Sequence, residues 1–355
     1  MLKRLLSHDL PRSRWLALVL LAILLALAFT PFVFPGTKAL NVAAKVIVFI
    51  VLAASFDLLL GYTGIVSFAQ TMFFGIGAYG IAIAATRLGP TWPALALGTL
   101  CALAVSLVLS LVIGLFSLRV RAIFFAMITL AVAAAFSTLA SQLSQFTGGE
   151  DGLTFRVPEA LRPGTDYLAE PFLGASIDGR FVTYYLIFIV ALVLVLALLR
   201  IVNSPFGRVL QAIRENDFRA EAIGYRTVVY RTLASVLSAL FATLAGVLLA
   251  LWLRYNGPDT TLSFEIMLDV LLIVVIGGMG TIYGAVAGSV LLVLAQNYLQ
   301  DLMKLAATAV QGVPVLAQIV SPDRWLLWLG ILFVLSVYYF PSGVVGRLRA
   351  LRRRP

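Results

Sequence analysis

Few side chains in this sequence are suited to covalent chemistry. The only histidine is His8, in the charged N-terminal tail, and the only cysteine is Cys101, within an apolar run. These counts exclude histidine-based triads, cysteine zinc sites and a disulfide framework. The sequence also contains no G-x-x-x-x-G-K-[ST] loop, so the chain does not bind ATP through a P-loop. We therefore expect a protein that is not an enzyme, binds no metal or cofactor of its own and takes its energy from outside.

Charges inside apolar stretches are the next candidates, because ionisable groups within a bilayer are costly and usually face a path or a partner. Lys45 and Asp57 share one stretch, but a helix would separate them by about 18 Å, too far to pair. Asp57 is expected either to be solvated at the helix end or to line a gate. Glu265 and Asp269 share a helix face. Their repulsion predicts water, a cation or an arginine such as Arg254 nearby, at a rim or an entrance.

Glycine and small polar residues interrupt two apolar stretches. The first lies between Gly61 and Gly80, and unwound backbone at membrane depth is tolerated only inside protein or beside a cavity. Gly280, Gly284 and Gly288 form a small-xxx-small row, which is typical of plain helix packing. Glycine-broken segments in both halves of a transporter point to its path. The candidate path residues are Asp57, Gly61, Gly64, Ser67, Gln70, Gly75, Gly77, Gly277, Gly278 and Gly280.

The composition requires a membrane. Hydrophobic residues make up 61% of the chain, charged residues only 12%, and the mean hydropathy is +1.03; an ordinary soluble domain has about 25% charged residues. We expect one all-α polytopic domain over 1–355. A span needs about 20 apolar residues, which predicts about ten spans, with nine and eleven as the alternative counts, at 15–34, 40–60, 62–86, 93–118, 122–143, 181–200, 230–253, 264–281, 283–300 and 324–341. The third is rich in glycine and is expected to be re-entrant or broken.

The distribution of basic residues predicts the orientation. The net charge is +10, but the arginines fall in short blocks between apolar runs, a pattern that excludes nucleic acid as a partner. By the positive-inside rule we expect a multi-pass membrane protein with both termini cytoplasmic. The first span ends with Ala26-Leu27-Ala28 and so imitates a signal peptide; we interpret it as a retained anchor.

Two segments are expected outside the bilayer. The extracytoplasmic loop, 144–180, is either a mere connection or a docking surface for a soluble receptor. The cytoplasmic segment, 203–226, has the pattern of one amphipathic helix, which begins at Ser204-Pro205 and is closed by Gly224. Its apolar face, which we expect to be buried, consists of Phe206, Val209, Ile213, Ala220 and Ile223. Acidic residues on its polar face are unfavourable for a helix on anionic lipid and favour a protein partner. Phe218 points to the polar side and is a candidate knob.

Several motifs resemble those of branched-chain amino acid ABC transporter permeases of the LivM/LivH type. They are the stretch from Gly61 to Tyr79, the turn at Thr147-Gly148-Gly149, the Glu221-Ala222-x-Gly224 signature and the run from Ile276 to Gly288. Asp57 departs from the family, where asparagine is common, and Ala285 stands where proline is common. In that family the cytoplasmic helix couples to an ATPase, which implies coupling roles for Arg208, Arg214, Glu215, Phe218, Glu221, Ala222 and Gly224.

The resemblance implies a permease subunit, in the bacterial inner membrane, of an ABC importer for branched-chain or other hydrophobic amino acids. Its expected partners are two ATPase subunits that hold ATP and Mg, a sister permease in a heterodimer, an extracytoplasmic substrate-binding protein and the lipid bilayer. The same machinery also serves urea, short amides and aromatic acids. A self-sufficient secondary transporter or channel is the alternative from another class, although it would have no use for a long cytoplasmic docking helix.

Overall fold

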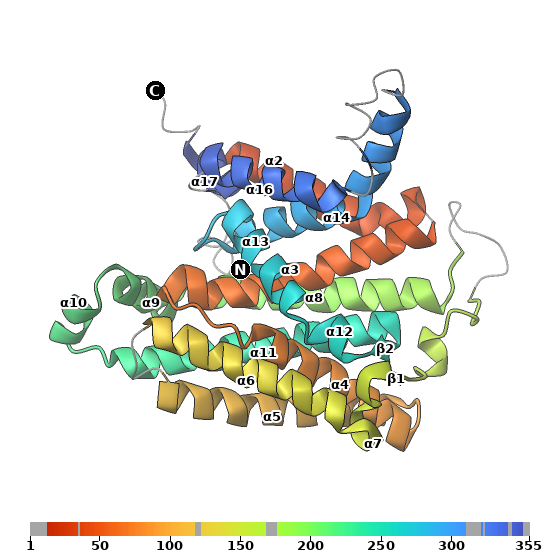
Figure 1. The fold of residues 1–355 in the computed structure, drawn as a ribbon, viewed down its shortest axis with the longest axis horizontal. Helices are drawn as coiled ribbons and strands as arrows, with labels where there is room; N and C mark the ends of the chain where they lie inside the picture. The colour runs from red at the N-terminus through yellow and green to blue at the C-terminus, as the bar shows by residue number, and fades with distance from the viewer. Residues whose placement is uncertain are drawn as a thin grey trace, which may run out of the picture.

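The computed structural model describes residues 13–34, 36–117, 122–167, 176–309, 321, 324–339 and 343–350 (Figure 1). Almost all of them are helical, which confirms the expected all-α membrane fold. In chain order the elements are α2 (Arg14–Val33), α3 (Thr37–Thr63), α4 (Gln70–Leu88), α5 (Trp92–Ser117), α6 (Ala122–Gln142), α7 (Ser144–Thr147), η1 (Gly149–Asp151), β1 (Leu153–Thr154), η2 (Glu159–Leu161), α8 (Gly179–Asn203), α9 (Pro205–Glu215), α10 (Asp217–Ala222), α11 (Thr227–Leu253), β2 (Tyr255–Asn256), α12 (Pro258–Thr261), α13 (Phe264–Gly277), α14 (Ile282–Ala309), α16 (Trp325–Tyr339) and α17 (Gly343–Ala350). His8 lies outside the described residues.

Within the described residues, nine helical segments are long and apolar enough to cross a membrane: α2 to α6, α8, α11, α12 together with α13, and α14. The tenth predicted span, 324–341, coincides with α16. That helix has 15 residues, which rise about 23 Å, less than a hydrocarbon core of about 30 Å. The nine long segments agree with the predicted count of about ten spans, and α16 lies where the tenth was expected.

The third predicted span, 62–86, has the wrong start but does contain the expected break. Helix α3 continues through to Thr63 and ends at Gly64, whose φ of 75° is left-handed. The chain then stays non-helical as far as Ala69, and α4 begins at Gln70. Glycine adopts positive φ without steric cost, so Gly64 ends the helix although the residues before it are apolar.

Helices α3, α4 and α11 form the centre of the bundle. Of the 18 most apolar consecutive residues of α3, 94% are buried inside the protein, whereas only 11% of the corresponding residues of α2 are buried. A Cβ at Gly77 of α4 would meet the backbone of Thr243 in α11, and one at Gly246 of α11 would meet the backbone of Phe74 in α4. The two helices therefore pack backbone to backbone, which only residues without a side chain allow.

Figure 1 shows that the bundle has two distinct ends. At one end α9 and α10 project beyond the long helices. At the other, β1 and β2 pair antiparallel, with Leu153 opposite Asn256 and Thr154 opposite Tyr255. This pairing ties the loop after α6 to the connection between α11 and α12. Of the predicted extracytoplasmic loop, 144–180, residues 168–175 lie outside the described part.

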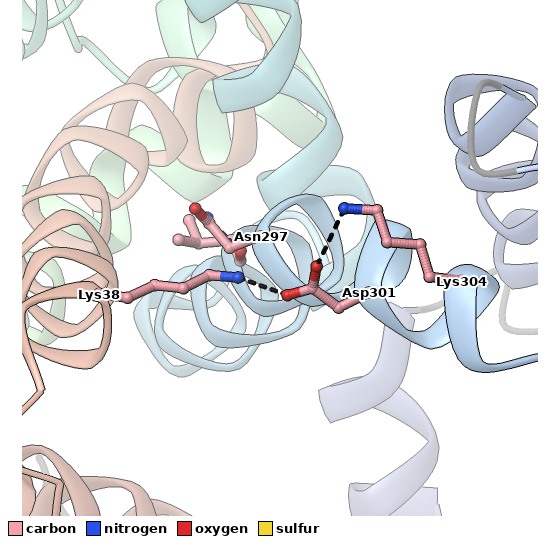
Figure 2. Close-up of polar contacts among 5 residues, drawn as sticks. Lys38, Asn297, Asp301 and Lys304 are labelled. Carbon is pink, nitrogen blue, oxygen red and sulfur yellow. Dashed lines mark hydrogen bonds and ion pairs between the residues drawn. The ribbon is translucent and has the colours of Figure 1, made fainter.

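Polar contacts also join α3 to α14 at the β1–β2 end. The Nζ of Lys38 contacts one carboxylate oxygen of Asp301, and the Nζ of Lys304 lies 3.8 Å from the other (Figure 2). The Lys38 and Asp301 side chains are 58% and 46% exposed. Exposed ion pairs of this kind contribute little to stability, because water and salt screen them, so these contacts position the helix ends more than they stabilise the fold.

Candidate functional site

The two glycine-rich breaks meet at one place in the bundle. One break follows α3, and the other joins α13 to α14, where Gly278 has φ 118° and Gly280 has φ 79°. A Cβ at Gly61 would meet the carboxylate of Asp57 and the backbone nitrogen of Gly280. The segments are 219 residues apart in the chain, yet their backbones touch. Only glycine permits both the positive φ and this close approach.

Asp57, Gly61 and Gly280 form the contact that we call the glycine junction. The N–H of Gly280 donates to Oδ1 of Asp57 at 2.8 Å, and Nη1 of Arg214 donates to the carbonyl oxygen of Gly61. Asp57 is fully buried, and its Oδ2 has no hydrogen-bond partner among the described residues. The interpretation of Asp57 as a solvated residue at a helix end is therefore wrong. Its role at a gate stays a prediction.

Two of the predicted polar path residues, Ser67 and Gln70, follow Gly61 closely in the sequence. The amide of Gln70 donates to Oγ of Ser55 at 2.6 Å, and Oγ of Ser238 donates to the carbonyl oxygen of Ser55 at 2.6 Å. These three buried side chains connect α3, α4 and α11. Ser67 is also buried, and its Oγ accepts from the N–H of Ala69 at 3.4 Å. The network satisfies polar groups inside the bundle, where an unpaired one would be costly.

Other predicted path glycines are placed where helices pack. A Cβ at Gly75 would meet the side chain of Leu262, and one at Gly277 would meet the backbone of Gly284. A Cβ at Gly288 would likewise meet the backbone of Ile273, so the small-xxx-small row holds α14 against α13. Gly278 accepts a hydrogen bond from Oγ1 of Thr281 at 2.9 Å. Gly75, Gly77 and Gly277 therefore lie at close contacts between elements, and their part in a translocation path stays a prediction.

The segment 203–226 is two helices, not the single helix that the sequence pattern predicted. Helix α9 ends at Glu215, and α10 begins at Asp217. Between them the backbone of Asn216 is extended, and its side-chain oxygen accepts from the N–H of Arg219 at 2.9 Å. Asparagine is a preferred N-cap residue, so Asn216 ends one helix and starts the next. The Asn216-Asp217 pair was the sequence signal for this break.

Contacts that the sequence did not reveal fix this segment to the start of α11. Oγ1 of Thr227 donates to Oε1 of Glu221 at 2.6 Å, and the side chain of Arg231 lies 3.0 Å from that of Asp217. The ring of Phe206 stacks on that of Tyr230 at 5.8 Å. We refer to residues 205–224 as the α9–α10 segment. These contacts fix the position of the α9–α10 segment relative to α11.

The other predicted coupling residues lie on the outer side of the α9–α10 segment. Phe218 is 86% exposed, and Ile223, which the helical pattern placed on the buried face, is 67% exposed. Arg208, Glu215 and Ala222 are exposed as well. Gly224 has φ 98° and follows α10, which confirms that it closes the helix. The side chain of Arg214 differs from these, because it reaches back to the glycine junction.

Comparison with known proteins identifies the family to which the chain is similar. The family described as branched-chain amino acid transport system / permease component matches residues 38–337. The chain is 27% identical over 323 residues to the high-affinity branched-chain amino acid transport system permease protein LivM of Salmonella typhimurium strain LT2, covering 87% of this chain and 74% of that protein. It is 28% identical over 324 residues to LivM of Escherichia coli strain K12, with the same coverage.

Another relative, matched over a shorter stretch, is the autoinducer 2 import system permease protein LsrC of Salmonella typhimurium strain LT2. It is 31% identical over 204 residues, which cover 55% of this chain and 50% of that protein. No solved structure matches the chain. The family match extends from the start of α3 into α16 and so includes both glycine-rich breaks and the α9–α10 segment. The chain belongs to the family of permease components of branched-chain amino acid transport systems.

Proposed function

We propose that this chain is a permease subunit of an ATP-driven importer of branched-chain and other hydrophobic amino acids, with ATPase subunits docked on the α9–α10 segment. One observation carries the proposal: the segment presents Phe218 at 86% exposure, while Arg214 of the same segment bonds to the glycine junction. A large exposed aromatic side chain on a fixed surface is typical of a docking site.

The same contacts suggest how ATP hydrolysis drives transport. A partner that shifts α9 pulls on Gly61 through Arg214, and Gly61 touches Gly280 in the second break. Helix segments can reorient at such breaks, because the backbone hydrogen bonds are interrupted there. ATP and Mg belong to the partner subunits. A sister permease and an extracytoplasmic substrate-binding protein complete the assembly, with the β1–β2 end as the receptor side.

Affinity purification from the native host in mild detergent tests the docking claim. The wild-type chain should retain P-loop ATPases and a second permease, identified by mass spectrometry. Phe218→Ala should lower ATPase recovery about tenfold or more, because exposed aromatic anchors contribute about 2 kcal/mol or more at interfaces. Phe146→Ala is the matched control, since Phe146 is 57% exposed at the opposite end. Repeated recovery of the chain alone, with transport after reconstitution, would identify a secondary transporter or channel instead.

Cysteine labelling tests the orientation in a Cys101→Ser background. In intact spheroplasts an impermeant maleimide should label Asp166→Cys, near the β1–β2 end, and should leave Ile223→Cys unlabelled until the cells are lysed. Both positions are exposed, so the membrane alone decides access. The reversed pattern would show that the α9–α10 segment faces outward and would rule out docking of a cytoplasmic ATPase.

A further inference from the structure

A polar cavity of about 770 Å³ lies between α3, α11, α13 and α14, toward the β1–β2 end. One stripe of α3 lines it, with Lys38 and Asn41 exposed and Lys45 half-buried about two helical turns further in. From α13 come Glu265 and Asp269. The cavity therefore leads from the solvent-exposed end of α3, and from the exposed Glu265, to the half-buried side chains of Lys45 and Asp269.

The deep end of this polar cavity carries both signs of charge. Lys45 lines the same cavity as Glu265 and Asp269. A lysine from α3 is therefore a cation that faces the acidic pair. Among the described residues Lys45 makes no ion pair within 4.0 Å, and Nε2 of Gln296 donates to Oδ1 of Asp269 at 2.7 Å. The Nζ of Lys45 lies over the ring of Phe49, 5.3 Å from its centroid, so the half-buried charges of Lys45 and Asp269 face one cavity without an ion pair between them.

A second cavity, of about 900 Å³, adjoins the first and shares Glu265 and Asp269 with it. Apart from this acidic pair its wall is mainly apolar and includes Leu268, Leu272 and Leu291. Both volumes fall in the range of about 300–1,000 Å³ that is typical of small-molecule sites. Glu265 and Asp269 therefore lie between the polar cavity, which suits charged groups, and the apolar cavity, which suits an aliphatic group.

We propose that the two cavities together bind an aliphatic α-amino acid as a zwitterion. The ligand carboxylate pairs with Lys45, its ammonium group lies against Glu265 and Asp269, and its side chain enters the apolar cavity. A molecule with both charges and an aliphatic chain matches all three parts, whereas one with a single charge leaves a lysine or a carboxylate unpaired at a cost. This site rests on the proposed function for its place in transport, but its occupancy can be measured separately.

Protection of an introduced cysteine tests the site in the full chain, in native membranes and with Cys101→Ser. Ile266 lines the polar cavity, so Ile266→Cys reports on it; Asp166→Cys is the reporter outside it. Leucine at ten times its dissociation constant should slow maleimide labelling of Ile266→Cys about 11-fold by mass action, and should not change labelling of Asp166→Cys. Leucinamide, which lacks the carboxylate, and 4-methylpentanoate, which lacks the ammonium group, should protect far less.

Charge variants identify the groups responsible. Lys45→Met and Asp269→Asn should each raise the leucine concentration for half-maximal protection about tenfold or more. Lys304→Met removes the same charge at the same end from a residue that lines neither cavity, and it should leave protection unchanged. Equal labelling of Asp166→Cys in all variants establishes that they are folded and inserted.

The outcomes separate this site from the proposed function. No protection by leucine, in membranes where uptake is intact, would overturn the zwitterion site and leave the importer standing. Equal protection by leucinamide would overturn the role of Lys45, and equal protection by 4-methylpentanoate that of the acidic pair. Selective protection by leucine in a chain that recovers no ATPase would support the site and reject the ATP-driven importer.

Discussion

Gly77→Ala should strongly reduce the yield of folded protein. The new Cβ would meet the backbone carbonyl of Thr243 in α11, and a backbone carbonyl, unlike a flexible side chain, cannot turn away. Helices α4 and α11 must therefore separate at the centre of the bundle, and overpacking of this kind costs about 1–3 kcal/mol or more. We expect a lower melting temperature in detergent and a several-fold smaller monodisperse yield by fluorescence size-exclusion chromatography.

Gly330→Ala is the matched control for this prediction. Gly330 also lies in an apolar helix, α16, but a Cβ there would meet nothing within 4 Å. Alanine is favoured over glycine in helices by about 1 kcal/mol, so this variant should melt at the same temperature or slightly higher. Equal melting temperatures and yields for the two variants would show that α4 and α11 do not pack backbone to backbone.

Arg214→Met should separate ATP hydrolysis from transport in the assembled complex. The side chain connects the docking surface to the carbonyl oxygen of Gly61, and a hydrogen bond to a charged group contributes about 1.5–3 kcal/mol. Phe218 and the outer face of the α9–α10 segment stay intact, so ATPase subunits should still bind and hydrolyse ATP. Uptake into proteoliposomes, measured with ATP turnover in the same sample, should fall about tenfold or more.

Arg219→Met removes the same charge from the same segment and serves as the control. The N–H of Arg219 bonds to Asn216, and this backbone contact survives the change of side chain. Uptake per ATP should therefore stay near the wild-type value. If Arg214→Met and Arg219→Met lower uptake equally, the effect is one of charge at the docking surface, and the link to the glycine junction has no part in coupling.

The transmembrane helices were predictable from the sequence because each depends on local composition. A span is recognised by about 20 apolar residues whatever surrounds it, and eight of the nine long segments overlap predicted spans closely. The break after α3 was also predictable, since glycine and hydroxyl residues weaken a helix on their own. Its position was not, because Gly64 with φ 75° ends α3 later than the apolar pattern indicated.

The α9–α10 segment shows how local patterns mislead. Its apolar spacing predicted one helix with Ile223 on the buried face, but Asn216 starts a new helix and so rotates the later residues relative to the earlier ones. Ile223 is exposed as a result. The exposure of Phe218 was predicted correctly, since an aromatic residue on a polar face is visible in the sequence.

The membrane-spanning segments and the family motifs follow from the sequence alone, because composition and short-range spacing carry them. Tertiary structure decided which distant residues meet. Asp57 bonds to the N–H of Gly280, Arg214 to Gly61, and Lys45 lies near Asp269, although each pair is more than 150 residues apart. These contacts depend on how helices pack around α3 and α11. Many packings would bury the same apolar residues, but only a few bring these glycines and charges together.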